Sequence, residues 1–135
     1  VDPNTRHELY LRKRIFLGND PGLRVAFELE NTSHVPIKCI FGIEHNWSVE
    51  DRNFMRPRKR KKIKSVLLRD RYFGLELRQE FSEGLDFWSF PVYTLNVTEK
   101  GLGKTFQETS FLFHKKISLE PGEKYSLETN LAVSE

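Results

Sequence analysis

Two tryptophans with polar neighbours are the residues of this 135-residue chain whose types and spacing best suit carbohydrate chemistry. Trp47 follows Glu44 within one short stretch, and Trp88 precedes a segment that contains Glu99 and Gln107. A sugar ring stacks its C–H face on an exposed aromatic ring, while nearby carboxylates and amides bond its hydroxyl groups. We therefore expect any sugar-binding site to use Trp47, Trp88, Glu44, Glu99 and Gln107.

The same residues also have a structural interpretation. Alternation along a strand requires that one of Phe87 and Trp88 points inward and the other outward. On this interpretation Trp88, like Trp47, belongs to the core. The polar residues would then hold turns together by bonding buried backbone groups. Both interpretations remain open from the sequence.

Patterns that would support independent catalysis are missing from the sequence. Glycoside hydrolysis needs two carboxylates at a set separation, and no spacing here pairs two of them. There is no Gly-x-Ser-x-Gly nucleophile elbow and no glycine-rich phosphate loop. The single cysteine, Cys39, lies in an apolar run and is expected to be a small buried side chain. We expect no catalytic residue, no metal and no cofactor.

A standalone mutarotase-like enzyme acting on a sugar is one alternative. It would use His45 or His114 as the acid and Glu44 or Glu99 as the base. General acid–base catalysis requires these groups within hydrogen-bond reach of one cleft. No sequence spacing supports such a pair.

A nucleic-acid-binding module is a second alternative, because Arg56–Lys64 holds seven basic residues. Such runs can bind phosphate backbones. However, removing these seven charges from the net charge of +3 leaves about −4, so the rest of the chain is acidic. We expect Arg56–Lys64 to be a solvated loop between strands or a contact surface between domains, and nucleic acid not to be a partner.

Strand patterns dominate the chain. Alternating apolar residues or aromatic-rich runs separated by turn residues predict five strands: Leu23–Glu30, Ile37–Ile43, Gly74–Phe81, Phe106–Ile117 and Tyr125–Val133. The third is expected to end at Ser82–Gly84. No window shows a helical stripe over three turns. Short strands between turns, in a chain long enough for one domain, predict an all-β fold, an antiparallel β-sandwich.

Composition bounds the setting of the protein. No apolar run is long enough to span a bilayer, and no signal peptide is visible. With one cysteine, the fold cannot contain an intramolecular disulfide. We expect a cytoplasmic protein. The many Lys, Arg and Glu residues, with one Met and one Cys, are compatible with a thermophilic source.

Two sequence elements carry a resemblance to a known family. The first is Gly42-Ile43-Glu44. The second contains Trp88-Ser89-Phe90-Pro91, Thr94, Thr98-Glu99-Lys100-Gly101 and Phe106-Gln107-Glu108. Together they resemble the C-terminal β-sandwich domain of the α-amylases and 4-α-glucanotransferases of glycoside hydrolase family 57. The resemblance extends from about Ile15 to Val133, and departs from the family where Glu108 replaces a glycine.

This resemblance implies a fold and a role. The fold would be the supersandwich also seen in galactose-mutarotase-like domains. Residues 1–135 would be a single domain, excised from the C-terminal part of a longer enzyme. The domain would be noncatalytic and would follow a (β/α) barrel that holds the two catalytic carboxylates. Its partners would be that barrel and α-glucan.

Overall fold

The computed structural model describes residues 6–18 and 22–135, and the described residues are almost entirely β-structure. The strands and a short 3-10 helix follow in this order: β1 (Leu9–Leu17), β2 (Gly22–Asn31), β3 (Ile37–Trp47), η1 (Arg52–Phe54), β4 (Arg58–Arg69), β5 (Glu76–Thr98), β6 (Gly101–Leu119) and β7 (Lys124–Ser134). All strand pairs are antiparallel, in the order β1-β2-β7-β5-β6-β3, with β4 attached to β5. The predicted all-β class is therefore confirmed.

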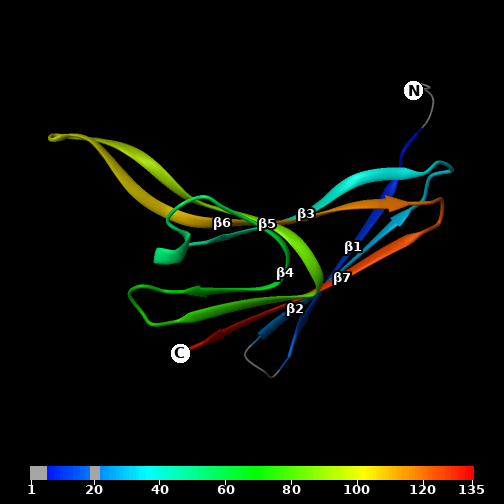
Figure 1. The fold of residues 1–135 in the computed structure, drawn as a ribbon, viewed down its shortest axis with the longest axis horizontal. Coiled ribbons are helices and arrows are strands. Elements are labelled where there is room, and N and C mark those ends of the chain that lie inside the picture. Colours follow the sequence, from blue (N-terminus) through cyan, green and yellow to red (C-terminus); the bar gives the residue numbers. More distant parts are fainter. Residues whose placement is uncertain (1–5, 19–21) are drawn as a thin grey trace.

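The sandwich arises because the long strand β5 changes partners along its length. Glu76–Phe81 pairs with β7, whereas Asp86–Thr98 pairs with β6. Between these two stretches the sheet divides into a β1-β2-β7 layer and a β3-β6 layer. Figure 1 shows β1, β2 and β7 running obliquely to β3 and β6. The inner faces of the two layers enclose the core.

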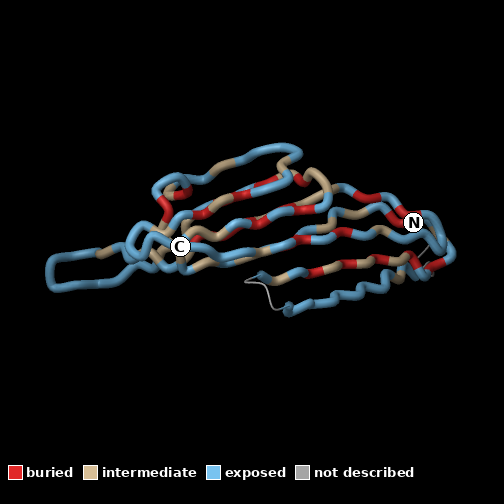
Figure 2. Tube along the Cα trace, turned by 90° about the horizontal axis from the view of Figure 1, so that it is seen from below, coloured by how far each residue is buried: buried red, intermediate tan, exposed pale blue. Residues whose placement is uncertain are grey.

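Phenylalanine rings fill most of that core. Phe27 of β2 meets Phe41 of β3 edge-on across the layers, with ring centroids 5.8 Å apart. Phe113 of β6 lies 4.4 Å from Phe81 and 5.0 Å from Phe87, both on β5. Figure 2 shows the buried positions recurring along the strands. The faces predicted for β2 and β3 are confirmed, because their odd-numbered residues from Leu23 to Ile43 point inward.

The prediction that a strand ends at Ser82–Gly84 is wrong, because β5 continues without interruption to Thr98. Gly84 marks a close approach rather than a turn. A Cβ built there would lie 3.0 Å from the carbonyl oxygen of Lys62 in β4. Only glycine lets the two backbones meet at this point.

The prediction that Arg56–Lys64 is a loop is also wrong, because its residues from Arg58 onward form the first half of β4. The register on β5 shifts around Lys62, whose φ of 52° marks a β-bulge. Among the described strands, β4 pairs only with β5, so it is an edge strand. Lysines and a bulge are common protections of an exposed edge against pairing with other chains.

Strand β1, at one end of the strand order, is also an edge strand and was not predicted. Its charged centre, Arg12–Arg14, hides the alternation that a strand normally shows. The register places Ile15 opposite Val25 and Leu17 opposite Leu23, so these side chains continue the inner face of β2. All of β1 is nevertheless exposed.

Candidate functional site

The outer face of the β4-β5-β6-β3 sheet carries a row of four side chains that could contact a ligand. Glu44 of β3 and Trp88 of β5 are both register partners of Leu112 in β6, and Lys59 of β4 is the partner of Trp88. Partners in register point to the same face of a sheet. The row therefore reads Glu44, Leu112, Trp88 and Lys59 across four strands.

Trp88 lies on the outer face, which contradicts the structural interpretation that placed it in the core. Its side chain is 43% exposed, whereas that of Phe87 is 1% exposed. Phe87 is the register partner of Phe113, and this pairing commits Phe87 to the core and Trp88 to solvent. An exposed indole of this kind is the platform that a sugar ring would need.

Two further groups hold the Trp88 ring. The Nζ atom of Lys59 lies 4.9 Å from the ring centroid, a cation–π contact. The His114 ring meets Trp88 edge-on, with centroids 4.8 Å apart. The Nε2 atom of His114 is buried and has no hydrogen-bond partner among the described residues.

A surface groove of about 710 Å³ lies beside Trp88. Its lining comes from β3, β4, β5 and β6 and consists of Ile40, Gly42, Lys62, Gly84, Asp86, Trp88, Leu112, His114, Lys115 and Lys116. Asp86 is fixed within it, because its Oδ1 accepts a hydrogen bond from the Lys62 amide at 3.3 Å. Glu44 at the end of the row accepts one from Asn46 at 3.2 Å. The face thus combines an aromatic surface with fixed polar groups.

Trp47 lies on the other side of the sheet. It is half-buried and packs against the core, as the structural interpretation predicted. Its ring contacts that of His45 at 5.6 Å. His45 is in turn hydrogen-bonded to Gln79 at 3.0 Å. Glu44 and Trp47, three residues apart on one strand, therefore point to opposite faces.

Glu99 and Gln107 belong to a hairpin that extends beyond the sandwich. Glu99 is eleven positions after Trp88, or about 36 Å along the strand at ~3.3 Å per residue. Glu99 is exposed at the turn between β5 and β6. Gln107 donates a hydrogen bond to Thr94 at 3.0 Å, which is the structural role expected of it. Of the five residues predicted from sequence, the structure brings only Glu44 and Trp88 together.

Sequence reasoning missed Lys59 and Asp86 and gave His114 a different role. No local motif marks them, because they come from three strands separated in the chain. The one available signal was parity: Asp86 lies two residues before Trp88 and so shares its face. Lys59 depends on the register between β4 and β5.

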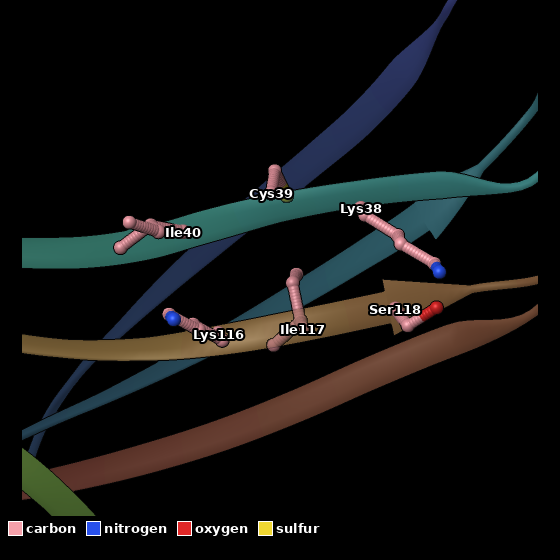
Figure 3. Close-up of a pocket in the computed structure, with 6 residues that line it drawn as sticks. All are labelled: Lys38, Cys39, Ile40, Lys116, Ile117 and Ser118. Atoms are coloured by element: carbon pink, nitrogen blue, oxygen red, sulfur yellow. The ribbon is translucent and has the colours of Figure 1, made fainter.

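A second pocket, of about 380 Å³, lies between β3 and β6 (Figure 3). Cys39 and Ile117 are register partners there, flanked by Lys38, Ile40 and Lys116. Cys39 is half-buried rather than fully buried as expected. The thiol has no hydrogen bond to a histidine in the described residues, so nothing indicates a nucleophile.

A polar clasp holds the fork of the sheet. Glu83 of β5 accepts a hydrogen bond from Lys115 of β6 and one from Tyr125 of β7, the latter at 2.5 Å. Burial alone raises the pKa of Glu83, but the two donors outweigh it and hold that pKa below the ordinary value of 4.5. Burial, followed by the bond to Glu83, raises the pKa of Tyr125 far above its ordinary value. The clasp is structural, because it ties both layers to one strand.

Comparison with known proteins places this fold in a family. The sequence matches the family described as alpha-amylase/4-alpha-glucanotransferase, C-terminal, over residues 3–129. The chain belongs to this family. The match covers nearly the whole chain, as the resemblance of its two motifs indicated. No curated protein matches the sequence.

Among solved structures, this family member is similar to the crystal structure of 4-alpha-glucanotransferase from Thermococcus litoralis. The identity is 23% and the TM-score 0.75, and the alignment covers 98% of this chain and 19% of that chain. At this identity the likeness establishes the fold. The chain spans about a fifth of the length of that protein.

The geometry also bears on the mutarotase-like alternative. His45 lies on the core side of β3 and Glu44 on the outer side, so a mutarotase-like pair of these two is not formed.

The described residues contain no cluster of three or more His, Cys, Asp or Glu that could hold a metal ion. In the described part of the chain, no helix is long and apolar enough to cross a membrane.

Proposed function

We propose that residues 1–135 form one noncatalytic accessory domain of an α-glucan-acting glycoside hydrolase or 4-α-glucanotransferase of glycoside hydrolase family 57. The family match over residues 3–129 carries this proposal. The domain supports a catalytic barrel, which supplies the two carboxylates that glycoside hydrolysis needs. The enzyme is cytoplasmic and thermophilic, a setting supported by the single cysteine and the charge-rich composition.

The outer face around Trp88 is the part of the domain that contacts α-glucan. Trp88 stacks on a glucose ring, and Glu44 and Asp86 accept hydrogen bonds from hydroxyl groups. Lys59 and Lys62 border the same surface and donate to ring or glycosidic oxygens. Support comes from the exposed indole and the adjoining groove. Trp47, Glu99 and Gln107 take no part in this contact.

Titration of the 135-residue chain with maltohexaose, followed by calorimetry, tests the glucan contact. Replacing Trp88→Ala should weaken binding about tenfold, which corresponds to ~1.4 kcal/mol. This is within the range of aromatic stacking energies, about 0.5–1.5 kcal/mol. Phe73→Ala is the matched control, because Phe73 is also an exposed aromatic residue but lies outside the groove. Cellohexaose controls for linkage, since the same sugar in β-linkage presents a different shape.

Equal affinity of the wild type and Trp88→Ala for maltohexaose would show that Trp88 does not contact the glucan. Absence of binding by the wild type would leave a purely architectural domain. The accessory role itself is tested by the coding sequence: an uninterrupted upstream barrel supports it, and a complete short gene contradicts it.

A further inference from the structure

The hairpin formed by the ends of β5 and β6, residues 93–106, extends beyond the two layers as an arm (Figures 1 and 2). Register partners in the arm alternate between two faces. Tyr93 pairs with Phe106, Leu95 with Lys104 and Val97 with Leu102, which places these six side chains on one face. That face is apolar apart from Lys104, whose Nζ lies 3.8 Å from the centroid of the Tyr93 ring.

The opposite face of the arm is polar and internally bonded. Asn96 donates to Thr105 at 2.9 Å, and Thr98 donates to the carbonyl oxygen of Gly101 at 2.9 Å. The bond from Gln107 to Thr94 continues this ladder toward the sandwich. The arm therefore holds its own shape and would lose little conformational freedom on binding.

The apolar face is uncovered although its residues would suit a core. Val97 is 87% exposed, Leu102 79% and Leu95 73%. Along β5, Tyr93, Leu95 and Val97 have the same parity as the buried Phe87, so they extend the inner face of the sheet past the point where the second layer stops. An exposed apolar patch that continues a packed core face marks a contact surface.

We propose that the apolar face of this arm docks against an apolar surface of the catalytic unit in the same polypeptide. This inference rests on the proposed function, which supplies the catalytic unit. The size of the apolar face favours a partner in the same polypeptide over a separate chain. Two strands of about six residues give a face roughly 20 Å long and 10 Å wide, at ~3.3 Å per residue and ~4.8 Å between strands.

A face of that size is too small for a stable dimer of two free chains. Standard interfaces bury about 800 Å² on each partner, and contacts well below this are weak. A covalently linked partner is different, because the link gives an effective concentration in the millimolar range. The arm is therefore suited to intramolecular docking rather than to self-association.

Photo-crosslinking in the full-length polypeptide tests the docking. A photoreactive p-benzoylphenylalanine is placed at Leu102 on the apolar face or, as matched control, at Thr105 on the polar face. After irradiation, mass spectrometry identifies the joined peptides. Leu102 should crosslink within one polypeptide to a peptide outside these 135 residues, and Thr105 should not. A crosslinked species of twice the mass, a partner peptide within residues 1–135, or equal crosslinking from both positions would overturn the proposal.

Limited proteolysis gives an independent readout, because trypsin can cut after Lys100 and Lys104 only when the arm is accessible. The triple variant Leu95→Ser, Val97→Ser, Leu102→Ser should be cut at these sites at least about tenfold faster than the wild-type polypeptide. The control double variant Thr94→Ser, Thr105→Ser changes the polar face but keeps both acceptor hydroxyl groups, and it should be cut at the wild-type rate. Equal rates for wild type and the first variant would contradict docking.

The two proposals fail in different ways. If the polypeptide crosslinks from Leu102 but does not act on α-glucan, the arm docks on a catalytic unit of another specificity. The docking proposal then holds and the proposed function is wrong. If the polypeptide acts on α-glucan but does not form this crosslink, the proposed function holds and the docking proposal is wrong.

Discussion

Glu44 and Trp88 lie on one row of the outer face, each opposite Leu112 on the strand between them. They are 44 residues apart in the chain, so no local sequence motif contains both. Their proximity follows from two registers, β3 on β6 and β6 on β5. A carboxylate and an indole separated by one apolar side chain can engage a hydroxyl group and the C–H face of one sugar.

Replacing Phe87 should cost far more stability than replacing its neighbour Trp88. Phe87→Ala removes a 1% exposed ring from the centre of the core and should cost about 3–5 kcal/mol. Trp88→Ala removes a ring that is 43% exposed, together with its contact with Lys59, which should cost about 1 kcal/mol or less. Urea unfolding measures both free energies. Comparable losses for the two variants would contradict the assigned faces.

Gly84→Ala should destabilise the fork of the sheet. The added Cβ would lie 3.0 Å from the Lys62 carbonyl oxygen, and a backbone atom cannot move aside as a flexible side chain can. We expect a loss of about 1–3 kcal/mol, the usual range for overpacking. Gly103→Ala is the matched control, because its Cβ would be in ordinary contact, 3.4 Å from the nearest atom. Thermal unfolding should show a lower melting temperature for the first variant and little change for the second.

Strands with one buried face, including the edge strand β3, were predictable from sequence, and strands that lack such a face were not. In β2 the alternation of Val25, Phe27 and Leu29 reflects directly which face meets the core. Strand β1 has no buried residue, and the first half of β4 is cationic, so neither shows the pattern. The fork in β5 was also unpredictable, because it depends on which distant strands pair with each half.

The candidate site was predictable only in its residue types. The sequence shows that Phe87 and Trp88 face opposite ways, but both rings are apolar, so it does not show which is buried. The pairing of Phe87 with Phe113 makes that choice. Glu99 is only eleven positions after Trp88 in sequence, yet the extended hairpin carries it away, while Gln107 at the base of the hairpin is bonded to Thr94.

Asn31→Asp should be strongly destabilising, although aspartate and asparagine have nearly the same size and shape. The fully buried Asn31 donates from Nδ2 to the carbonyl oxygens of Val35 and Leu119, at 2.8 and 2.9 Å. Aspartate keeps the size but lacks both donors, which leaves two buried carbonyl groups facing a carboxyl group. We expect a loss of at least about 2 kcal/mol, at ~1–3 kcal/mol for each unsatisfied group. Asn130→Asp, at an exposed position of β7, should be nearly neutral in the same urea unfolding experiment.

The clasp of Glu83 with Lys115 and Tyr125 should make stability depend on pH in the acid range. The folded-state pKa of Glu83 lies below 4.5, so its carboxylate binds fewer protons in the folded than in the unfolded chain. Its contribution is therefore complete above about pH 5 and is lost as the pH falls through 4.5 toward the folded-state pKa. Glu83→Gln removes this dependence. The stability difference between wild type and variant, measured by urea unfolding, should thus shrink on acidification.

Two comparisons make the Glu83 prediction specific: a control variant at Glu99, and the loss of stability that Tyr125 should cause at alkaline pH. Glu99→Gln removes an equal charge from the exposed tip of the arm, so its difference from wild type should be small. Tyr125 acts in the opposite range: its raised pKa keeps the phenol protonated in the folded chain, and stability should fall as the pH rises above about 10. Tyr125→Phe should remove this alkaline loss. A difference between wild type and Glu83→Gln that persists unchanged through the acid range would show that the carboxylate does not hold the fork.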